Sequence, residues 1–261
     1  MVNKEKNKIV LIITVADIIL FIIFVIGVSY ILQHFNDSKD NKQIYEEIKN
    51  VNIIKESNVE PVTTNKISEN VQKVTNLKQE NKDVVGWIKI DNTIIDYPIL
   101  QTTDNDYYLT HNYKKEKSKY GSIYLNKESN ILDNYSNVII YGHNMKDEQM
   151  FNTLLKYESE DFYNEHKTIK ITTEQEENEY EIVSVFKSRI FYQDEQNVFR
   201  YYNYTKFKDK NTYNEFIENC KEIELYDTGV SAKYGEQLIT LITCEYSQDN
   251  GRMVVVAKEI V

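Results

Sequence analysis

The fold is decided by TLITCE at residues 240–245 and by RMVVV at residues 252–256. Both stretches are rich in apolar and β-branched residues, and the polar segment between them ends in the turn-forming pair Asn250–Gly251. This pattern predicts a β-hairpin. Antiparallel pairing would bring Cys244, at the end of one strand, close to Arg252, at the start of the next.

A thiol and a guanidinium at one strand end suggest nucleophilic chemistry. A permanent cation close to a sulfur favours the thiolate, which is the form that attacks carbonyl carbon, and the same cation can stabilise an oxyanion formed there. A leaving amine also needs an acid. A candidate acid is His143, in the stretch VIIYGHNM at residues 138–145, where it follows an apolar strand and Gly142. Asp147 then predicts the start of a helix.

Three motifs in this order resemble the signatures of the sortases, the transpeptidases that attach surface proteins to Gram-positive cell walls: YGHNM at residues 141–145, TLITC at 240–244, and Arg252. The resemblance covers roughly residues 67–261. It is strongest to the class B branch, because Met150–Phe151 and a helix follow the histidine motif and a helical segment precedes the strands. One position departs, since Ile242 stands where class B members often carry a small hydroxyl residue.

The resemblance implies a mainly β fold, a closed barrel of seven to eight strands with an N-terminal helix and an inserted helix before the last strands. It also implies the site: Cys244 as nucleophile, His143 as acid and base, and Arg252 as the oxyanion partner. The candidate substrate-binding residues are Asn105, Leu109, Tyr141, Thr243 and Glu245. Successive strand residues point to opposite faces, so we expect Glu245 to point away from Cys244 and toward the substrate or the loop.

The implied activity is a cysteine transpeptidase that cleaves the C-terminal sorting pentapeptide of exported proteins after threonine. The acyl group would pass through a thioacyl-enzyme to an amino group of the peptidoglycan stem or of its lipid-linked precursor. No cofactor is expected, and no metal, because the cysteines and histidines are never set at ligand spacing. Class A relatives are assisted by calcium, but this sequence has no clear acidic site to which that calcium could be assigned.

Two alternatives remain open at this stage. One is a secreted cysteine peptidase that only hydrolyses; its papain-like form is disfavoured because that family places cysteine before histidine. The other is a non-catalytic surface scaffold in which Cys220 and Cys244 form a structural disulfide, since both would lie in an oxidising compartment. Counting free thiols tests the scaffold alternative, because two free thiols would exclude this disulfide.

Residues 9–32 are an almost unbroken apolar run, longer than the roughly 20 residues that a helix needs to cross a bilayer. Asp17 interrupts the run and makes the free energy of membrane insertion less favourable by about 2.5–3.5 kcal/mol. The favourable contributions of the Leu, Ile, Phe and Val residues outweigh this cost. Lys4, Lys6 and Lys8 precede the run and predict a cytoplasmic N-terminus. No small-residue cleavage site follows, so the sequence predicts a single-pass, uncleaved signal anchor with the rest of the chain facing the cell wall.

The sequence thus predicts four segments: a cytoplasmic N-terminus (1–8), a transmembrane signal anchor (9–32), an extracytoplasmic helical spacer (33–66) and a catalytic domain (67–261). Ile67, Val71, Val74 and Leu77 recur at helical spacing and predict a helix that packs on the barrel. Short β-type runs separated by turns begin at residues 84–90 and 93–95, with predicted helices at Met150–Tyr157 and Asn211–Ile223. The net charge is −10, and no basic cluster lies outside the membrane-proximal lysines, which excludes a nucleic-acid partner.

Overall fold

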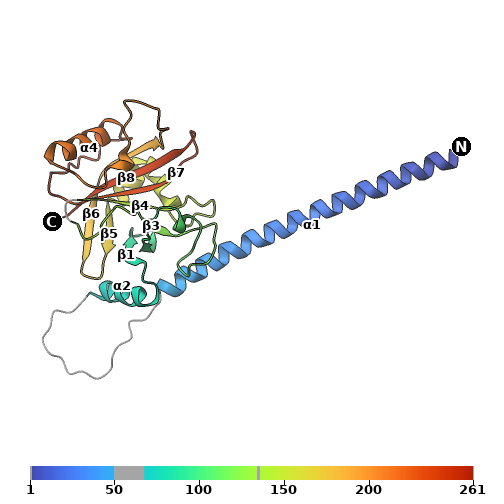
Figure 1. The fold of residues 1–261 in the computed structure, drawn as a ribbon, viewed down its shortest axis with the longest axis horizontal. Coiled ribbons are helices and arrows are strands. Elements are labelled where there is room, and N and C mark those ends of the chain that lie inside the picture. The colour runs from blue at the N-terminus through green and yellow to red at the C-terminus, as the bar shows by residue number, and fades with distance from the viewer. Residues whose placement is uncertain (1, 50–67, 134–135, 261) are drawn as a thin grey trace, which may run out of the picture. The chain divides into compact units, whose positions relative to one another are not determined.

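The structure is a computed structural model that describes residues 2–49, 68–133 and 136–260 (Figure 1). The chain forms two compact units, Met1–Ile44 and Tyr45–Val261. The first unit lies within one long helix, α1 (Val2–Lys49), which contains the apolar run. The part of the predicted spacer from residue 50 to residue 66 lies outside the described residues.

The second unit is built on a closed barrel of eight strands in the order β1-β2-β3-β4-β7-β8-β6-β5, which confirms the predicted fold. Its elements are α2 (Glu69–Glu80), β1 (Val84–Lys89), β2 (Asp96–Leu100), η1 (Tyr107–Leu109), β3 (Ile123–Leu125), β4 (Asn137–Tyr141), η2 (Asn152–Glu158), α3 (Glu160–Glu165), β5 (Thr168–Thr172), β6 (Glu177–Arg189), η3 (Tyr201–Asn203), α4 (Lys210–Glu222), β7 (Leu238–Cys244) and β8 (Gly251–Glu259).

The strands β4, β7 and β8 form the centre of the barrel wall. β7 pairs in parallel with β4 and antiparallel with β8. Residues 238–243 of β7 are all buried, because one face of the strand looks into the barrel and the other is covered. A cluster that includes Ile242, Val254 and Phe216 places α4 among the elements on the covered side. This double burial explains why the sequence of β7 is continuously apolar and does not alternate.

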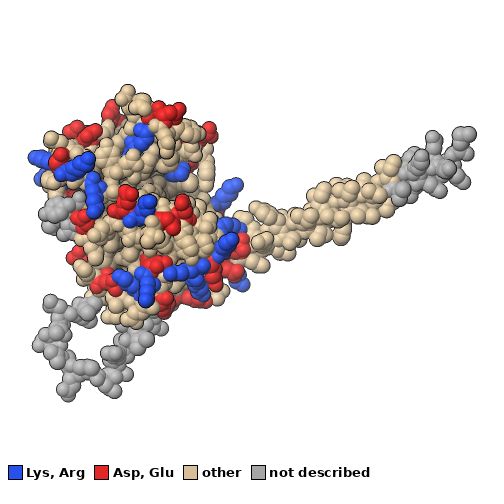
Figure 2. Space-filling model, in the orientation of Figure 1, with Lys and Arg blue, Asp and Glu red and all other residues tan. Residues whose placement is uncertain are grey.

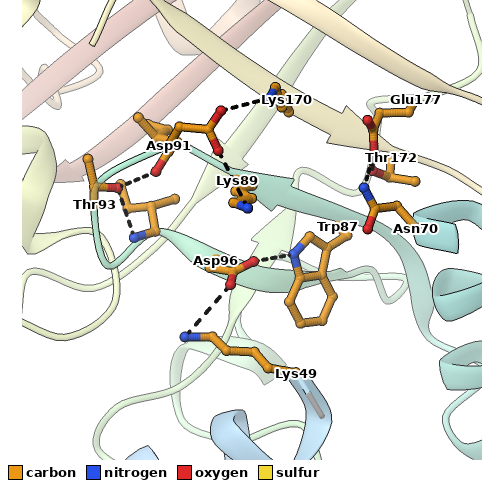
Figure 3. A network of polar contacts seen from close by, with 12 residues as sticks. Lys49, Asn70, Trp87, Lys89, Asp91, Thr93, Asp96, Lys170, Thr172 and Glu177 are labelled. Atoms are coloured by element: carbon orange, nitrogen blue, oxygen red, sulfur yellow. Dashed lines mark hydrogen bonds and ion pairs between the residues drawn. The ribbon is translucent and has the colours of Figure 1, made fainter. Parts of the chain in front are cut away.

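Helix α2 closes another part of the barrel, against β1 and β5. Its buried stripe consists of Val71, Val74 and Leu77, three of the four residues whose helical spacing predicted that this helix packs on the barrel. Beside it, the indole Nε1 of Trp87 donates to Asp96 Oδ1 at 2.7 Å (Figure 3). These contacts fix β1 against β2.

The last turn of α1 belongs to the second unit. Tyr45 and Ile48 are buried, and the Tyr45 ring meets the Tyr97 ring edge-on at 4.9 Å between centroids. Lys49 lies 3.9 Å from Asp96 (Figure 3). The Tyr97 hydroxyl in turn accepts a hydrogen bond of 3.2 Å from the backbone N–H of Met150, so this turn packs beneath the segment that follows β4.

Two predicted elements are corrected. The segment after the histidine motif does not form an α-helix from Asp147, because Glu148 and Met150 have φ values of 64° and 59°, which a right-handed helix cannot contain. A 3-10 helix, η2, begins only at Asn152. The predicted strand at residues 93–95 is part of a turn, and β2 starts at Asp96. By contrast, α4 lies within one residue of its predicted bounds.

Acidic and basic side chains are interspersed over the second unit on the face shown in Figure 2, and no large basic patch appears there. The same face of α1 shows almost no charge along its apolar part. The surface in view therefore shows no electrostatic footprint for nucleic acid.

Candidate active site

The hairpin of β7 and β8 places a thiol beside a guanidinium. Cys244 is paired with Arg252 in the β7–β8 register, as the sequence predicted, and both side chains are half-buried. The Arg252 Nη1 donates to the backbone oxygens of Asn250 at 3.1 Å and of Gly251 at 2.8 Å. The cation is thus held by the backbone of its own hairpin.

The parallel pairing of β4 and β7 brings the histidine to the same barrel edge. Tyr141 is level with Ile242, and the Gly142 N–H donates to the Ile242 oxygen at 3.2 Å. Gly142 has no room for a side chain, because a Cβ there would lie 2.7 Å from the ring of Phe151. Since parallel strands end at one edge, His143 follows β4 at the level where Cys244 ends β7.

The His143 ring is oriented by a backbone carbonyl. Its Nε2 lies 2.7 Å from the oxygen of Leu109, at the end of η1. A carbonyl oxygen only accepts, so Nε2 carries the proton and Nδ1 is the nitrogen left for proton transfer. The His143 oxygen accepts from the Phe151 N–H at 2.8 Å, which fixes the backbone on the other side of the ring.

Asn144 links the His143 segment to the end of β7. Its Nδ2 donates to the backbone oxygen of Cys244 at 2.9 Å, and its Oδ1 accepts from Asn152 Nδ2 at 2.7 Å. Sequence reasoning placed Asn144 in the histidine motif but gave it no role. A side-chain contact across 100 positions has no local sequence signal; the only clue is a carboxamide directly after the histidine.

The predicted substrate-binding residues occupy different environments. Leu109 is 37% exposed, and the Tyr141 hydroxyl accepts from Asn126 Nδ2 at 3.1 Å. Burial raises the pKa of Tyr141, partly offset by that hydrogen bond and by the positive charge of Arg252. The Leu109 oxygen thus lies at His143, and Tyr141 lies within the field of Arg252.

The other two candidates without charge make structural hydrogen bonds. The Thr243 side chain is buried, and its hydroxyl donates to the Gly142 oxygen at 2.8 Å, which ties β7 to the end of β4. The Asn105 Oδ1 accepts from the Lys127 N–H at 2.8 Å. In the structure, these two side chains hold the loops and strands around the site.

Glu245 is turned into the hairpin loop. Its carboxylate accepts from the Ser247 N–H at 2.8 Å and from the Ser247 hydroxyl at 2.6 Å, and Lys187 Nζ lies 3.9 Å away. Burial alone would raise the pKa of Glu245, but the bonds from Ser247 and the charge of Lys187 together lower it. A charge held in this way is compensated locally and does not pair with Arg252.

An aromatic cluster that sequence reasoning did not single out packs against the covered side of β7. Tyr201 is fully buried there, and its hydroxyl has no hydrogen-bond partner among the described residues. Its ring meets Phe186 edge-on at 5.5 Å. Burial raises the pKa of Tyr201, and the charge of Arg252 opposes this effect.

The two cysteines are both free. Cys220 is buried in α4, whereas Cys244 is partly exposed at the strand end. The structure therefore contains no Cys220–Cys244 bridge. Among residues 2–49, 68–133 and 136–260, no group of three or more His, Cys, Asp or Glu side chains is arranged to hold a metal ion.

Comparisons with known proteins agree with this geometry. The protein-family model of the sortase domain matches residues 88–260 of this chain. Sortase B of Listeria monocytogenes is 36% identical over 232 residues, which cover 86% of this chain and 90% of that protein. A crystal structure of Bacillus anthracis sortase B has a TM-score of 0.70 and 34% identity, covering 87% of this chain and 99% of that one.

The structure of a Staphylococcus aureus sortase B–substrate complex has a TM-score of 0.69 and 27% identity, covering 88% of this chain and 98% of that one. The chain belongs to the sortase family. Its class of enzyme is the cysteine transpeptidase, and the relatives named here are all sortase B proteins. The resemblance seen in the sequence motifs is therefore confirmed.

Proposed function

We propose that the chain cleaves a sorting motif of exported proteins after threonine and transfers the acyl group to an amino group of the cell-wall precursor. The observation that carries the proposal is the edge shared by three groups: Cys244 paired with Arg252, and His143 on the adjacent parallel strand. The closed barrel and the sortase B relatives support it.

The first half-reaction starts with the His143 ring protonated at Nδ1 as well as at Nε2. The Cys244 thiolate attacks the threonine carbonyl carbon, and Arg252 stabilises the oxyanion. The C–N bond then breaks as His143 Nδ1 gives its proton to the departing amine. The Nε2–H, bound to the Leu109 oxygen, keeps the ring in place during this transfer. The product is a thioester on Cys244.

In the second half-reaction, the acceptor amine attacks the thioester carbonyl. His143 Nδ1 takes the proton from the attacking nitrogen, the C–S bond breaks, and the thiolate of Cys244 is restored. The amine must outcompete water, which requires positioning near the place where the acceptor is made. One helix among the described residues, α1, is long and apolar enough to cross a membrane. We propose that its residues 9–32 are the single-pass anchor that holds the catalytic domain at the outer membrane face.

The test uses the full-length chain in detergent micelles and a pool of fluorogenic pentapeptides, with and without a peptide amine. We expect cleavage after threonine, an acyl adduct on Cys244 in the intact mass, and an amide product when the amine is present. Cys244→Ala should lose all three, whereas Cys220→Ala should keep them.

Three results contradict the proposal. Cleavage by Cys244→Ala would exclude this nucleophile. Hydrolysis without any amide product at saturating amine would identify a peptidase. Absence of cleavage, together with a Cys220–Cys244 bridge in the intact mass, would identify a scaffold.

A further inference from the structure

We infer that Asn144 is a positioning residue that holds the backbone of the nucleophile against the loop of the catalytic histidine. The inference rests on the proposed function, because it takes Cys244 and His143 as the reacting pair. Its basis is the bond from Asn144 Nδ2 to the Cys244 oxygen and the opposite bond from Asn152 Nδ2 to Asn144 Oδ1.

The two bonds together require a carboxamide. The Cys244 oxygen only accepts, so the atom that faces it must be the amide nitrogen, and the Asn144 oxygen then faces Asn152. Aspartate has the same shape, but when ionised it only accepts, and its oxygen would oppose the Cys244 carbonyl. The site therefore requires both the donor and the acceptor group of asparagine, in addition to its size.

The bond lies where β7 ends and the chain must turn. Beyond Cys244, the Glu245 N–H donates to the Gly251 oxygen at 2.9 Å. The peptide group between Cys244 and Glu245 is therefore held at its oxygen by Asn144 and at its N–H by Gly251. Such fixation sets the direction in which the Cys244 side chain leaves the strand. Asn144 is also the next residue after His143, so one amide joins the backbones that carry both reacting groups.

The loop of Asn144 is itself closed. Asn144 and Met150 form an isolated β-bridge, and the His143 oxygen accepts from the Phe151 N–H. Asn152, in the first turn of η2, then reaches back to Asn144. The amide is thus presented to Cys244 by a loop with fixed ends, which is the arrangement that a positioning residue requires.

A purely structural role makes different predictions. If Asn144 only stabilised the loop, its loss would lower the melting temperature but would leave the rate per folded molecule and its pH profile unchanged. If Asn144 positions the nucleophile, its loss should change the reactivity of Cys244 in fully folded protein. Thiol reactivity follows the thiolate fraction, so its pH profile reports the surroundings of the sulfur.

The experiment compares Asn144→Ala, Asn144→Asp and Asn152→Ala in the full-length chain in detergent micelles. The matched control is Asn81→Ala, because Asn81 makes the same kind of bond, from Nδ2 to the Tyr113 oxygen at 2.8 Å, at the end of α2. The readouts are the melting temperature, kcat and KM for peptide cleavage, and the rate of Cys244 alkylation by iodoacetamide between pH 5 and pH 10.

We expect Asn144→Ala to lower kcat about tenfold to hundredfold with little change in KM, since small displacements of reacting groups cost this much. Its alkylation profile should move to higher pH. Asn144→Asp should move it further, because a carboxylate near the sulfur opposes the thiolate. Asn152→Ala should give a smaller effect in the same direction, and Asn81→Ala should lower the melting temperature alone.

The inference is wrong if both Asn144 variants match Asn81→Ala in kcat and in alkylation profile at equal folded fraction. The alkylation arm needs no substrate, so it gives an answer even if no peptide is cleaved. A failure of the proposed function appears separately, as cleavage that survives Cys244→Ala.

Discussion

The Nε2 atom of His143 lies 2.7 Å from the backbone oxygen of Leu109, a residue 34 positions earlier in the chain. The neutral imidazole must then be the Nε2–H tautomer. His166 is the opposite case, because its Nδ1 lies 2.9 Å from the Phe162 oxygen.

We therefore expect ¹⁵N NMR of the neutral imidazoles to show a protonated Nε2 in His143 and a protonated Nδ1 in His166. The His143→Gln variant assigns the first set of signals, and His166→Gln the second. An Nδ1–H tautomer at His143 would contradict the orientation used in the proposed proton transfer.

The two thiols should differ strongly in reactivity. Burial, with a contribution from Glu224, raises the pKa of Cys220 well above its ordinary value, whereas Cys244 is partly exposed. Because the thiolate is the reactive form, we expect iodoacetamide to label one thiol in the folded chain at pH 8 and two after denaturation. Peptide mapping should place the label on Cys244, and Cys244→Ala should show none before unfolding. Equal labelling of Cys220 in the folded chain would contradict its burial.

Arg252 should be irreplaceable by lysine. Its Nη1 already contacts two carbonyl oxygens of the hairpin, and a guanidinium keeps further donors for an oxyanion, whereas lysine offers one point charge. We expect Arg252→Met to lower kcat by about 10²–10³, the range typical for loss of one oxyanion donor. Arg252→Lys should recover only a small part. An unchanged kcat in Arg252→Met, with an unchanged melting temperature, would remove Arg252 from the mechanism.

Lys73 should make the free energy of unfolding depend on pH in the alkaline range. Burial lowers its pKa to about 8, even though its Nζ lies 3.4 Å from the centre of the Trp87 ring, a contact that favours the ammonium. The folded state therefore binds fewer protons than the unfolded state between pH 8 and the ordinary value of 10.5, and stability should rise with pH across that window.

The measurement is chemical denaturation of the full-length chain at pH 7.5 and pH 9.5, against Lys73→Met. The variant keeps an unbranched side chain over the ring but cannot titrate. Its free energy of unfolding should exceed that of the parent at pH 7.5, and the difference should shrink at pH 9.5. A constant difference at both pH values would show that burial does not perturb Lys73.

Glu245 should stabilise the fold through its charge. Its pKa is lowered in the folded state, so the contribution is present above the ordinary value of 4.5 and is lost as the pH falls below it. Glu245→Gln should lower the melting temperature at pH 7 by about 2–4 °C, if one hydrogen bond worth about 1 kcal/mol is lost. The gap between variant and parent should close toward pH 3. A gap that stays constant would assign the effect to shape alone.

The hairpin could be predicted because its signals are local, whereas the closed barrel was implied by the resemblance of three motifs to the sortases. The apolar runs of β7 and β8 and the Asn250–Gly251 turn determine the pairing, and the register of Cys244 with Arg252 follows from the loop length. The helix α4 was also predicted to within one residue, and in the structure Asp209 accepts from the Thr212 N–H as its N-cap. These elements obey short-range rules of periodicity and capping.

The rest of the site depends on contacts that sequence patterns do not carry. The partner of His143 is the backbone oxygen of Leu109, an atom that every residue type possesses. The contact of Asn144 with Cys244 depends on two strands being parallel neighbours, which is a property of the whole barrel. The error after the histidine motif has the same origin, since Met150 takes its left-handed conformation while its N–H binds the buried Tyr97 hydroxyl.

The closure of the barrel has a consequence for selectivity. An open sheet presents unpaired backbone groups at its edge, and any extended peptide can add there as a further strand regardless of its side chains. In this barrel each of the eight strands is already paired on both sides. Among the described strands, an extended peptide therefore finds no unpaired edge to join. Discrimination among passing chains must come from the loops and side chains at the rim, where the sequence of the peptide can be read.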